Sequence, residues 1–184
     1  RNSYKSYKDG VEVELGFMSE IQAITFKDNP QAGVGKDCYD IIGEEVGAWG
    51  VPGGLKETVS SMLPSVKDGN LRTGMMTLFG TANDIDKGTV DFADIFENPE
   101  AGEFLPFYDI WGEMEEKVEG FFFPVQLNLI GHYDEQGNSN LASALEAENL
   151  ERSKLELGGA TSSQMSLRFR EFPTKSSEAL ASIS

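Results

Sequence analysis

Two short apolar runs, each followed at once by polar residues, are the feature that most constrains the fold of this chain. The first run covers residues 38–43 and is followed by two glutamates, and the second covers residues 73–79 and is followed by Gly80 and Thr81. Neither run alternates regularly with polar residues, which is typical of strands covered on both faces of a parallel sheet. We therefore expect two buried parallel strands that carry these polar residues at their carboxyl ends.

The segment between the two runs predicts a helix. Leu55, Val59 and Met62 recur at the spacing of one helical face. A strand, a helix and a second strand of these lengths form a βαβ unit, in which the two strands are parallel. The sequence therefore predicts an α/β fold, with this βαβ unit within residues 1–83 and a mixed α/β region in residues 84–184.

The polar residues at the two predicted strand ends fit one half of a nucleotide-hydrolysis site. Open parallel sheets bind their ligands outside the carboxyl ends of the strands. ATP hydrolysis needs an acidic group that holds Mg²⁺, directly or through water, and a second group that orients the attacking water. Glu44 and Glu45 supply two carboxylates for these roles. Gly80, Thr81 and Asn83 supply a close backbone approach, a hydroxyl and an amide for the terminal phosphate. The alternative is a pair of solvated glutamates at a strand end.

A second glycine-containing segment does not have the pattern of a phosphate-binding loop. Such a loop reads G-x-x-x-x-G-K-[ST]. Counting back from Gly35 and Lys36, Pro30 stands where the first glycine belongs, and Asp37 stands where the hydroxyl belongs. The negative charge of Asp37 would also oppose a phosphate. We therefore expect Lys36 to be a surface residue or to contact a neighbouring group.

The formal net charge of this 184-residue chain is -16, and much of it is concentrated in one region. Residues 84–119 contain twelve acidic residues and only two lysines. Binding to a phosphate backbone requires lysine and arginine side chains that replace counterions, so this region by itself would repel nucleic acid. A solvated acidic surface is the simpler interpretation, and an acidic binding patch is the alternative.

Other features exclude some classes of protein. No apolar run approaches the roughly 20 residues that a membrane-spanning helix needs, and no secretory signal is visible. The one cysteine, Cys38, rules out an internal disulfide framework and lies in a predicted strand as a small core thiol. The one histidine, His132, gives no histidine-based metal site, and the turn at residues 134–138 lacks the ligand positions of a calcium loop.

Pattern and turn residues predict further elements outside the βαβ unit. A hairpin is expected in residues 1–20 with its turn at Asp9 and Gly10, followed by a strand over residues 21–26. A helix should begin at Thr89, and residues 104–111 and 120–129 should be extended. A helix is expected over residues 141–157 with Leu141, Leu145 and Leu155 on its apolar side, followed by two shorter helices.

The order and spacing of these segments resemble the ATPase portion of the large subunit of tailed-bacteriophage terminases, the DNA-packaging motor. No single segment is diagnostic, but the resemblance covers nearly the whole chain. The segments that carry it are residues 24–29, 35–36, 41–47, 64–66, 79–81, 96–101, 121–124, 134–139 and 172–174.

This resemblance implies a RecA-like sheet, with residues 41–45 as the Walker B strand. Glu44 would be the metal-linked acid and Glu45 the catalytic one. Residues 79–81 would be the motif that couples hydrolysis to DNA movement, and residues 84–184 would lead toward a nuclease domain. The implied cofactors are ATP and Mg²⁺. The implied partners are double-stranded DNA, identical subunits in a ring, the portal and the small terminase subunit. The implied location is the host cytoplasm and, transiently, the capsid portal. No membrane is implied.

Two departures from the family pattern concern the site. Val34 stands where the family often has an arginine, and Ala82 and Asn83 stand where the coupling motif usually continues with glycines. The phosphate-binding Walker A loop is not found in the chain, so we expect it upstream of Arg1, with the chain a fragment of a longer protein that by itself binds ATP poorly.

Two other functions compete with the motor. The first is a non-catalytic acidic interaction module that docks a partner through its phenylalanine-rich segments. The second is a carboxylate-metal hydrolase. Its ligands would be Asp84, Asp86, Asp91 and Asp94.

Overall fold

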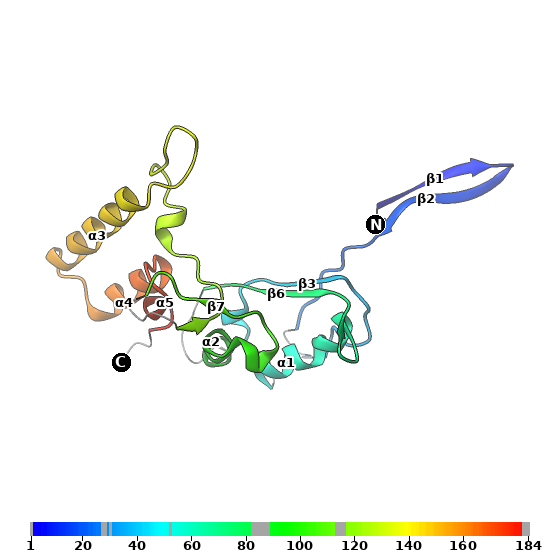
Figure 1. The fold of residues 1–184 in the computed structure, drawn as a ribbon, viewed down its shortest axis with the longest axis horizontal. Coiled ribbons are helices and arrows are strands. Elements are labelled where there is room, and N and C mark those ends of the chain that lie inside the picture. Colours follow the sequence, from blue (N-terminus) through cyan, green and yellow to red (C-terminus); the bar gives the residue numbers. More distant parts are fainter. Residues whose placement is uncertain are drawn as a thin grey trace.

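The chain folds as a mixed α/β protein in the computed structural model, which describes residues 2–26, 29, 31–51, 53–81, 89–112 and 117–181. Within these residues the strands pair two by two, and one of the pairs is parallel. Figure 1 shows an elongated arrangement, with a hairpin at one end and a group of helices at the other. The predicted α/β class is confirmed at this level.

The parallel pair is the predicted βαβ unit. Strands β3 (Asp40–Gly43) and β6 (Met75–Leu78) pair in parallel, with Asp40 opposite Met75 and Gly43 opposite Leu78. Helix α1 (Gly54–Met62) lies between them in sequence. The short helix η1 (Val46–Ala48) follows β3, and the short helix η2 (Leu63–Val66) follows α1. A small hairpin of β4 (Lys67–Asp68) and β5 (Leu71–Arg72) then precedes β6.

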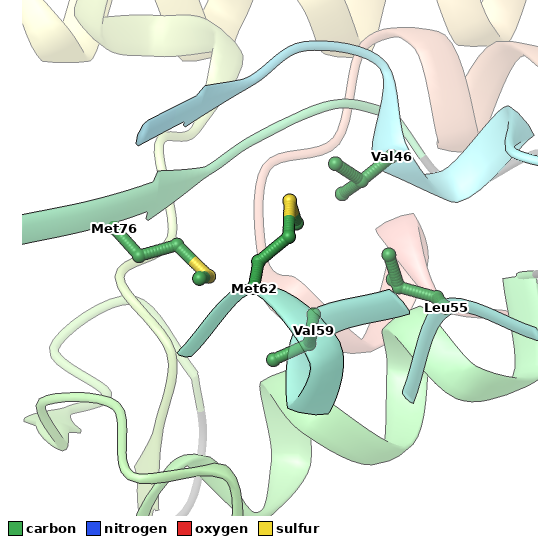
Figure 2. Packing of buried hydrophobic residues seen from close by; sticks show 5 residues of the cluster. All are labelled: Val46, Leu55, Val59, Met62 and Met76. Carbon is green, nitrogen blue, oxygen red and sulfur yellow. The ribbon is translucent and has the colours of Figure 1, made fainter. Parts of the chain in front are cut away.

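The hydrophobic core lies between the parallel pair and α1 (Figure 2). Figure 2 shows Leu55, Val59 and Met62 pointing from α1 toward Met76 of β6 and Val46 of η1. Those three α1 residues are the predicted helical face, and burying each side chain stabilises the fold by about 1.5–3 kcal/mol. Phe92 and Ile95 of the later helix α2 pack against the same cluster.

Only one face of the parallel pair is covered by this core. Met76 is buried, whereas Ile42 is 72% exposed and Met75 is 58% exposed. The expectation that both strands are covered on both faces is therefore wrong for the described chain. An unbroken apolar run shows that both faces of a strand are suited to burial. It does not show whether a second layer is present to bury the other face.

The amino-terminal hairpin has the predicted form. Strands β1 (Asn2–Lys8) and β2 (Val11–Ser19) are antiparallel, and Asp9 and Gly10 turn between them with φ of 54° and 79°. Figure 1 shows this hairpin extending away from the rest of the chain. The strand predicted over residues 21–26 is wrong, because no strand forms there. Phe26 instead stacks on the ring of Trp49, with 5.4 Å between ring centroids.

Helix α2 (Thr89–Glu97) begins where the sequence predicts and leads into η4 (Pro99–Gly102). The aromatic segments after it are mostly irregular, and only β7 (Phe107–Tyr108) and β8 (Val118–Glu119) pair. The sequence predicts extended segments over residues 104–111 and 120–129. Of these residues only the two of β7 form a strand, so the prediction is confirmed for them alone. The predicted boundary between residues 83 and 84 lies outside the described residues.

The carboxyl-terminal part is helical. After η5 (Val125–Leu127) come α3 (Leu141–Leu157), α4 (Ser162–Glu171) and α5 (Ser176–Ala179), as predicted from the spacing and the breaks (Figure 1). Capping explains two of the boundaries. The side chain of Asn140 accepts a hydrogen bond from the backbone of Ser143, and Thr161 forms a capping box with Gln164.

The buried face of α3 differs from the predicted one. The leucines at 141, 145 and 155 are partly exposed, and Ala144 and Glu148 are buried instead. Glu148 is 1% exposed and accepts hydrogen bonds from Arg152 at 3.0 Å and from Arg168 of α4. Arg152 also binds Glu178, which connects α3 to α5. An ionic network, rather than an apolar stripe, therefore joins these three helices, which a search for apolar periodicity does not detect.

Candidate functional site

The carboxyl ends of β3 and β6 lie side by side and leave the sheet at the same edge. The backbone N–H of Phe79 donates to the carbonyl of Gly43 at 2.9 Å, and the N–H of Val46 donates to the carbonyl of Phe79 at 3.2 Å. These bonds extend the pairing beyond the parallel register of the two strands. The predicted adjacency of the two polar strand ends is confirmed.

Glu45 and Thr81 meet at this edge. The hydroxyl of Thr81 donates a hydrogen bond to Oε2 of Glu45 at 3.3 Å, and both residues are exposed to solvent. Glu45 occupies the left-handed region, with φ 53° and ψ 38°. This backbone costs a residue other than glycine about 1 kcal/mol and must be held by its surroundings. A strained, exposed carboxylate with a hydroxyl partner has the features of a functional group.

Two glycines, one from each strand end, allow this close approach. A Cβ placed on Gly80 would lie 2.8 Å from the Cα of Glu45, and one placed on Gly47 would lie 2.4 Å from the carbonyl oxygen of Thr81. Real Cβ atoms do not approach other atoms this closely, so each position requires glycine or a shift of the backbone. The role predicted for Gly80, a close approach to phosphate, stays a prediction. Gly80 here makes room for the neighbouring strand end.

Glu44 lies at the same edge with its side chain exposed. Its backbone carbonyl accepts a hydrogen bond of 3.0 Å from the indole N–H of Trp49. Trp49 is not among the residues that the sequence predicts for this site. One feature of the sequence could have indicated it. A tryptophan stands four to five positions after the two glutamates, in a loop that does not otherwise require a large aromatic side chain.

Two exposed carboxylates at a strand edge are suitable ligands for Mg²⁺ in the presence of a nucleotide. Mg²⁺ is usually held by one or two carboxylates, with substrate phosphates and water completing its coordination. In the described part of the chain, no three His, Cys, Asp or Glu side chains are grouped closely enough to hold a metal ion by themselves. Glu44 and Glu45 are therefore two carboxylates of the kind that could contribute to such a shared site.

The remaining residues that the sequence singles out are the following. Asn83 falls outside the described residues. Lys36, in the rejected phosphate loop, donates to the side chain of Gln22 at 2.7 Å. Of the rival acidic set, Asp84 and Asp86 are also outside the described residues.

Asp91 and Asp94, the described members of that set, bind Lys56 of α1. Asp91 accepts from the backbone N–H of Lys56 at 3.2 Å, and Asp94 accepts from its ammonium group at 2.5 Å. The hydrogen bond to Asp94 outweighs the effect of burial and raises the pKa of Lys56. These contacts anchor α2 on α1.

His132 and the turn after it have structural contacts. The Nδ1 atom of His132 lies 2.8 Å from the hydroxyl of Ser143 in the first turn of α3. The carboxylate of Asp134 accepts hydrogen bonds from the side chain and backbone of Asn138 and from the backbone of Gln136. The side-chain bond of Asn138 is the main cause that lowers the pKa of Asp134. This arrangement is the turn that the sequence predicts.

Comparisons of the chain with known protein families, with curated proteins and with solved structures find no match. The described helices include none that is both long and apolar enough to cross a membrane.

Proposed function

We propose that this chain provides the acidic half of an ATPase site in a viral DNA-packaging motor, as part of a RecA-like sheet. One observation carries the proposal: Glu45 and Thr81, which follow two parallel strands, meet across 3.3 Å at the carboxyl edge of the pair. A pair of glutamates solvated independently at a strand end does not require this contact, the left-handed backbone of Glu45 or the close approach of Gly80.

We assign the two carboxylates the roles that the resemblance to the terminase family implies. Glu44 would hold Mg²⁺, directly or through water, and the metal would neutralise charge on the β- and γ-phosphates. Glu45 would accept a hydrogen bond from the attacking water and orient it toward the γ-phosphate. The hydroxyl of Thr81 holds one oxygen of Glu45, which leaves the second oxygen available for that water. Such positioning is the main protein contribution to phosphoryl transfer.

Contacts behind the strand ends favour a coupling role for residues 79–81. Gly47 lies between the backbone of Thr81 and the ring of Phe92, as the near contacts of a Cβ placed on Gly47 indicate. A shift of Thr81 on loss of the γ-phosphate would therefore press on η1 and on α2. Packed interfaces of this kind convert small displacements into movements of whole elements.

The partners of the motor are part of the same proposal. In the described part of the chain β3 and β6 pair only with each other, so the remaining strands of the sheet would pair at their outer edges and another layer would cover the exposed face. The phosphate-binding loop would come from the same longer protein. Because this chain carries a net charge of -16, we expect basic surfaces outside it to contact double-stranded DNA. Identical subunits in a ring, the portal and the small terminase subunit complete the proposed assembly, which acts in the host cytoplasm and transiently at the capsid portal.

The proposal is tested in the longer protein that carries this chain and a phosphate-binding loop. We expect DNA-stimulated ATP hydrolysis by the wild-type protein and none above background for Glu45→Gln. The matched control is Glu146→Gln, which changes an exposed glutamate of α3 and should leave the rate unchanged. Reading the coding sequence upstream of Arg1 provides an independent test, because a G-x-x-x-x-G-K-[ST] motif must be found there.

A non-catalytic interaction module is the second candidate. The observation that favours it is the exposure of Phe121 and Phe123 next to the acidic segment. Phe107 meets Phe121 edge to face, with 5.3 Å between ring centroids, so these rings form one exposed aromatic surface. If this candidate is correct, no phosphate-binding loop precedes the chain, and Glu45→Gln has no effect on partner binding.

A further inference from the structure

The peptide group between Glu44 and Glu45 is held from outside the strand by a side chain. The indole N–H of Trp49 donates to the carbonyl oxygen of Glu44 at 3.0 Å. The same peptide group contains the nitrogen of Glu45. Fixing its plane therefore fixes the reference from which φ of Glu45 is measured, and so the direction in which the side chain of Glu45 leaves the backbone.

Two contacts hold the indole in place. Phe26 stacks on it with 5.4 Å between ring centroids and 28° between the planes. Gly43 lies close to the edge of the ring, and a Cβ at this position would lie 3.3 Å from the Cη2 atom of Trp49. The absence of a side chain at Gly43 therefore makes room for the ring beside the end of β3.

Backbone hydrogen bonds hold the turn after Glu45, whereas none within the described residues holds the peptide group before it. The carbonyl of Glu45 accepts from the N–H of Ala48 at 2.9 Å, and the N–H of Val46 donates to Phe79 at 3.2 Å. Both bonds act on atoms that follow the Cα of Glu45. The indole of Trp49 supplies the restraint on the preceding side, which a left-handed residue other than glycine needs.

We propose that Trp49 is a positioning residue for Glu45, holding the left-handed backbone that aims the carboxylate. This inference rests on the proposed ATPase function. It assigns Trp49 a role in the chemical step and no role in nucleotide binding, because the hydrogen bond of its indole goes to the backbone of the acidic pair. Loss of the indole N–H should therefore lower kcat and leave KM for ATP unchanged.

The kinetic test uses Trp49→Phe in the longer ATPase, with Trp111→Phe as the matched control, since Trp111 lies in another loop of the described chain. We expect kcat to fall about tenfold for Trp49→Phe, the effect of one hydrogen bond, with KM for ATP within about twofold of wild type. Trp111→Phe should retain the wild-type values. An unchanged kcat, or a parallel loss in kcat and ATP affinity, overturns the inference.

The outcomes separate this inference from the function on which it rests. An active Trp49→Phe variant beside an inactive Glu45→Gln variant overturns the positioning role alone. An active Glu45→Gln variant overturns the proposed function.

A spectroscopic test needs neither substitution nor turnover. In the ¹⁵N-labelled wild-type chain, the indole N–H of Trp49 should exchange with solvent more slowly than that of N-acetyltryptophanamide, because it is donated to Glu44. Exchange at the rate of the free indole overturns the positioning role, and this measurement decides the question if Trp49→Phe fails to fold.

Discussion

The hydroxyl of Thr81 donates a hydrogen bond to the carboxylate of Glu45 across 3.3 Å, although 36 positions separate the two residues in sequence. The βαβ unit brings them together, because parallel strands present their carboxyl ends at one edge of the sheet. This contact joins the residue proposed to act on water to the segment proposed to couple hydrolysis to movement.

The first prediction concerns that contact. Thr81→Val removes the hydroxyl while preserving the branched shape of the side chain, so Glu45 loses the donor that holds one of its oxygens. We expect kcat for ATP hydrolysis to fall by about three- to tenfold, the effect of a hydrogen bond worth about 1 kcal/mol. Thr81→Ser keeps the donor and should retain most of the activity. Equal rates for the two variants would show that the contact does not contribute.

The close approach of the strand ends predicts a strong effect of a single methyl group. In Gly80→Ala the new Cβ would lie 2.8 Å from the Cα of Glu45, so the backbone must move. We expect a loss of about 1–3 kcal/mol in the free energy of unfolding, measured by urea denaturation. Gly50→Ala is the control, because a Cβ at that position has no atom within 4 Å. Gly80→Ala with wild-type stability would contradict the described approach.

The core between α1 and the parallel pair is tested through Leu55. This side chain is 0% exposed and packs in the buried cluster. Leu55→Ala should lower the free energy of unfolding by about 2–5 kcal/mol, because it leaves a cavity beside Val46 and Val59. Leu71→Ala, at a residue that is 67% exposed, should change it by less than about 0.5 kcal/mol. Similar losses for the two variants would show that this core does not form.

The junction of α3 and α5 should depend on pH. Burial raises the pKa of Glu178, but hydrogen bonds from Arg152 and from the backbone and hydroxyl of Thr174 outweigh it and bring the pKa below the usual 4.5. As the pH falls below 4.5, the unfolded chain binds a proton at Glu178 before the folded chain does. The contribution of ionised Glu178 to the free energy of unfolding is thus complete above pH 4.5. It is lost as the pH falls through the pKa of Glu178 in the folded state.

Thermal unfolding followed by circular dichroism at several acidic pH values measures this dependence. The wild-type melting temperature should fall more steeply with decreasing pH than that of Glu178→Gln, which has no carboxyl group to titrate at this position. Parallel curves for the two proteins would contradict the role of the ion pair between Glu178 and Arg152.

Local patterns in the sequence predict much of this fold. The spacing of Leu55, Val59 and Met62 gives the helix, and the uninterrupted apolar runs on either side give the parallel strands. Asp9 and Gly10 give the hairpin turn, because both adopt positive φ. In each of these cases the residues that determine the element lie within it or next to it.

The features that the sequence does not predict depend on contacts between distant residues. The strand expected over residues 21–26 has suitable residues but pairs with no strand in the described part of the chain, and Phe26 packs on Trp49 instead. The inward face of α3 is set by Glu148, whose burial depends on Arg168 of α4. At the candidate site the acidic pair could be recognised from sequence. The left-handed backbone of Glu45 and the hydrogen bond from Trp49 could not, because they depend on how the chain returns to the strand end.

The most direct test of the central claim is a single-turnover measurement of ATP cleavage by Glu45→Gln in the longer protein. The variant should bind ATP in the presence of Mg²⁺ with near wild-type affinity and release no phosphate over many wild-type turnover times, because the group that activates water is missing. Phosphate release at the wild-type rate from ATP bound to the variant would contradict the assignment of Glu45 and, with it, the proposed motor function.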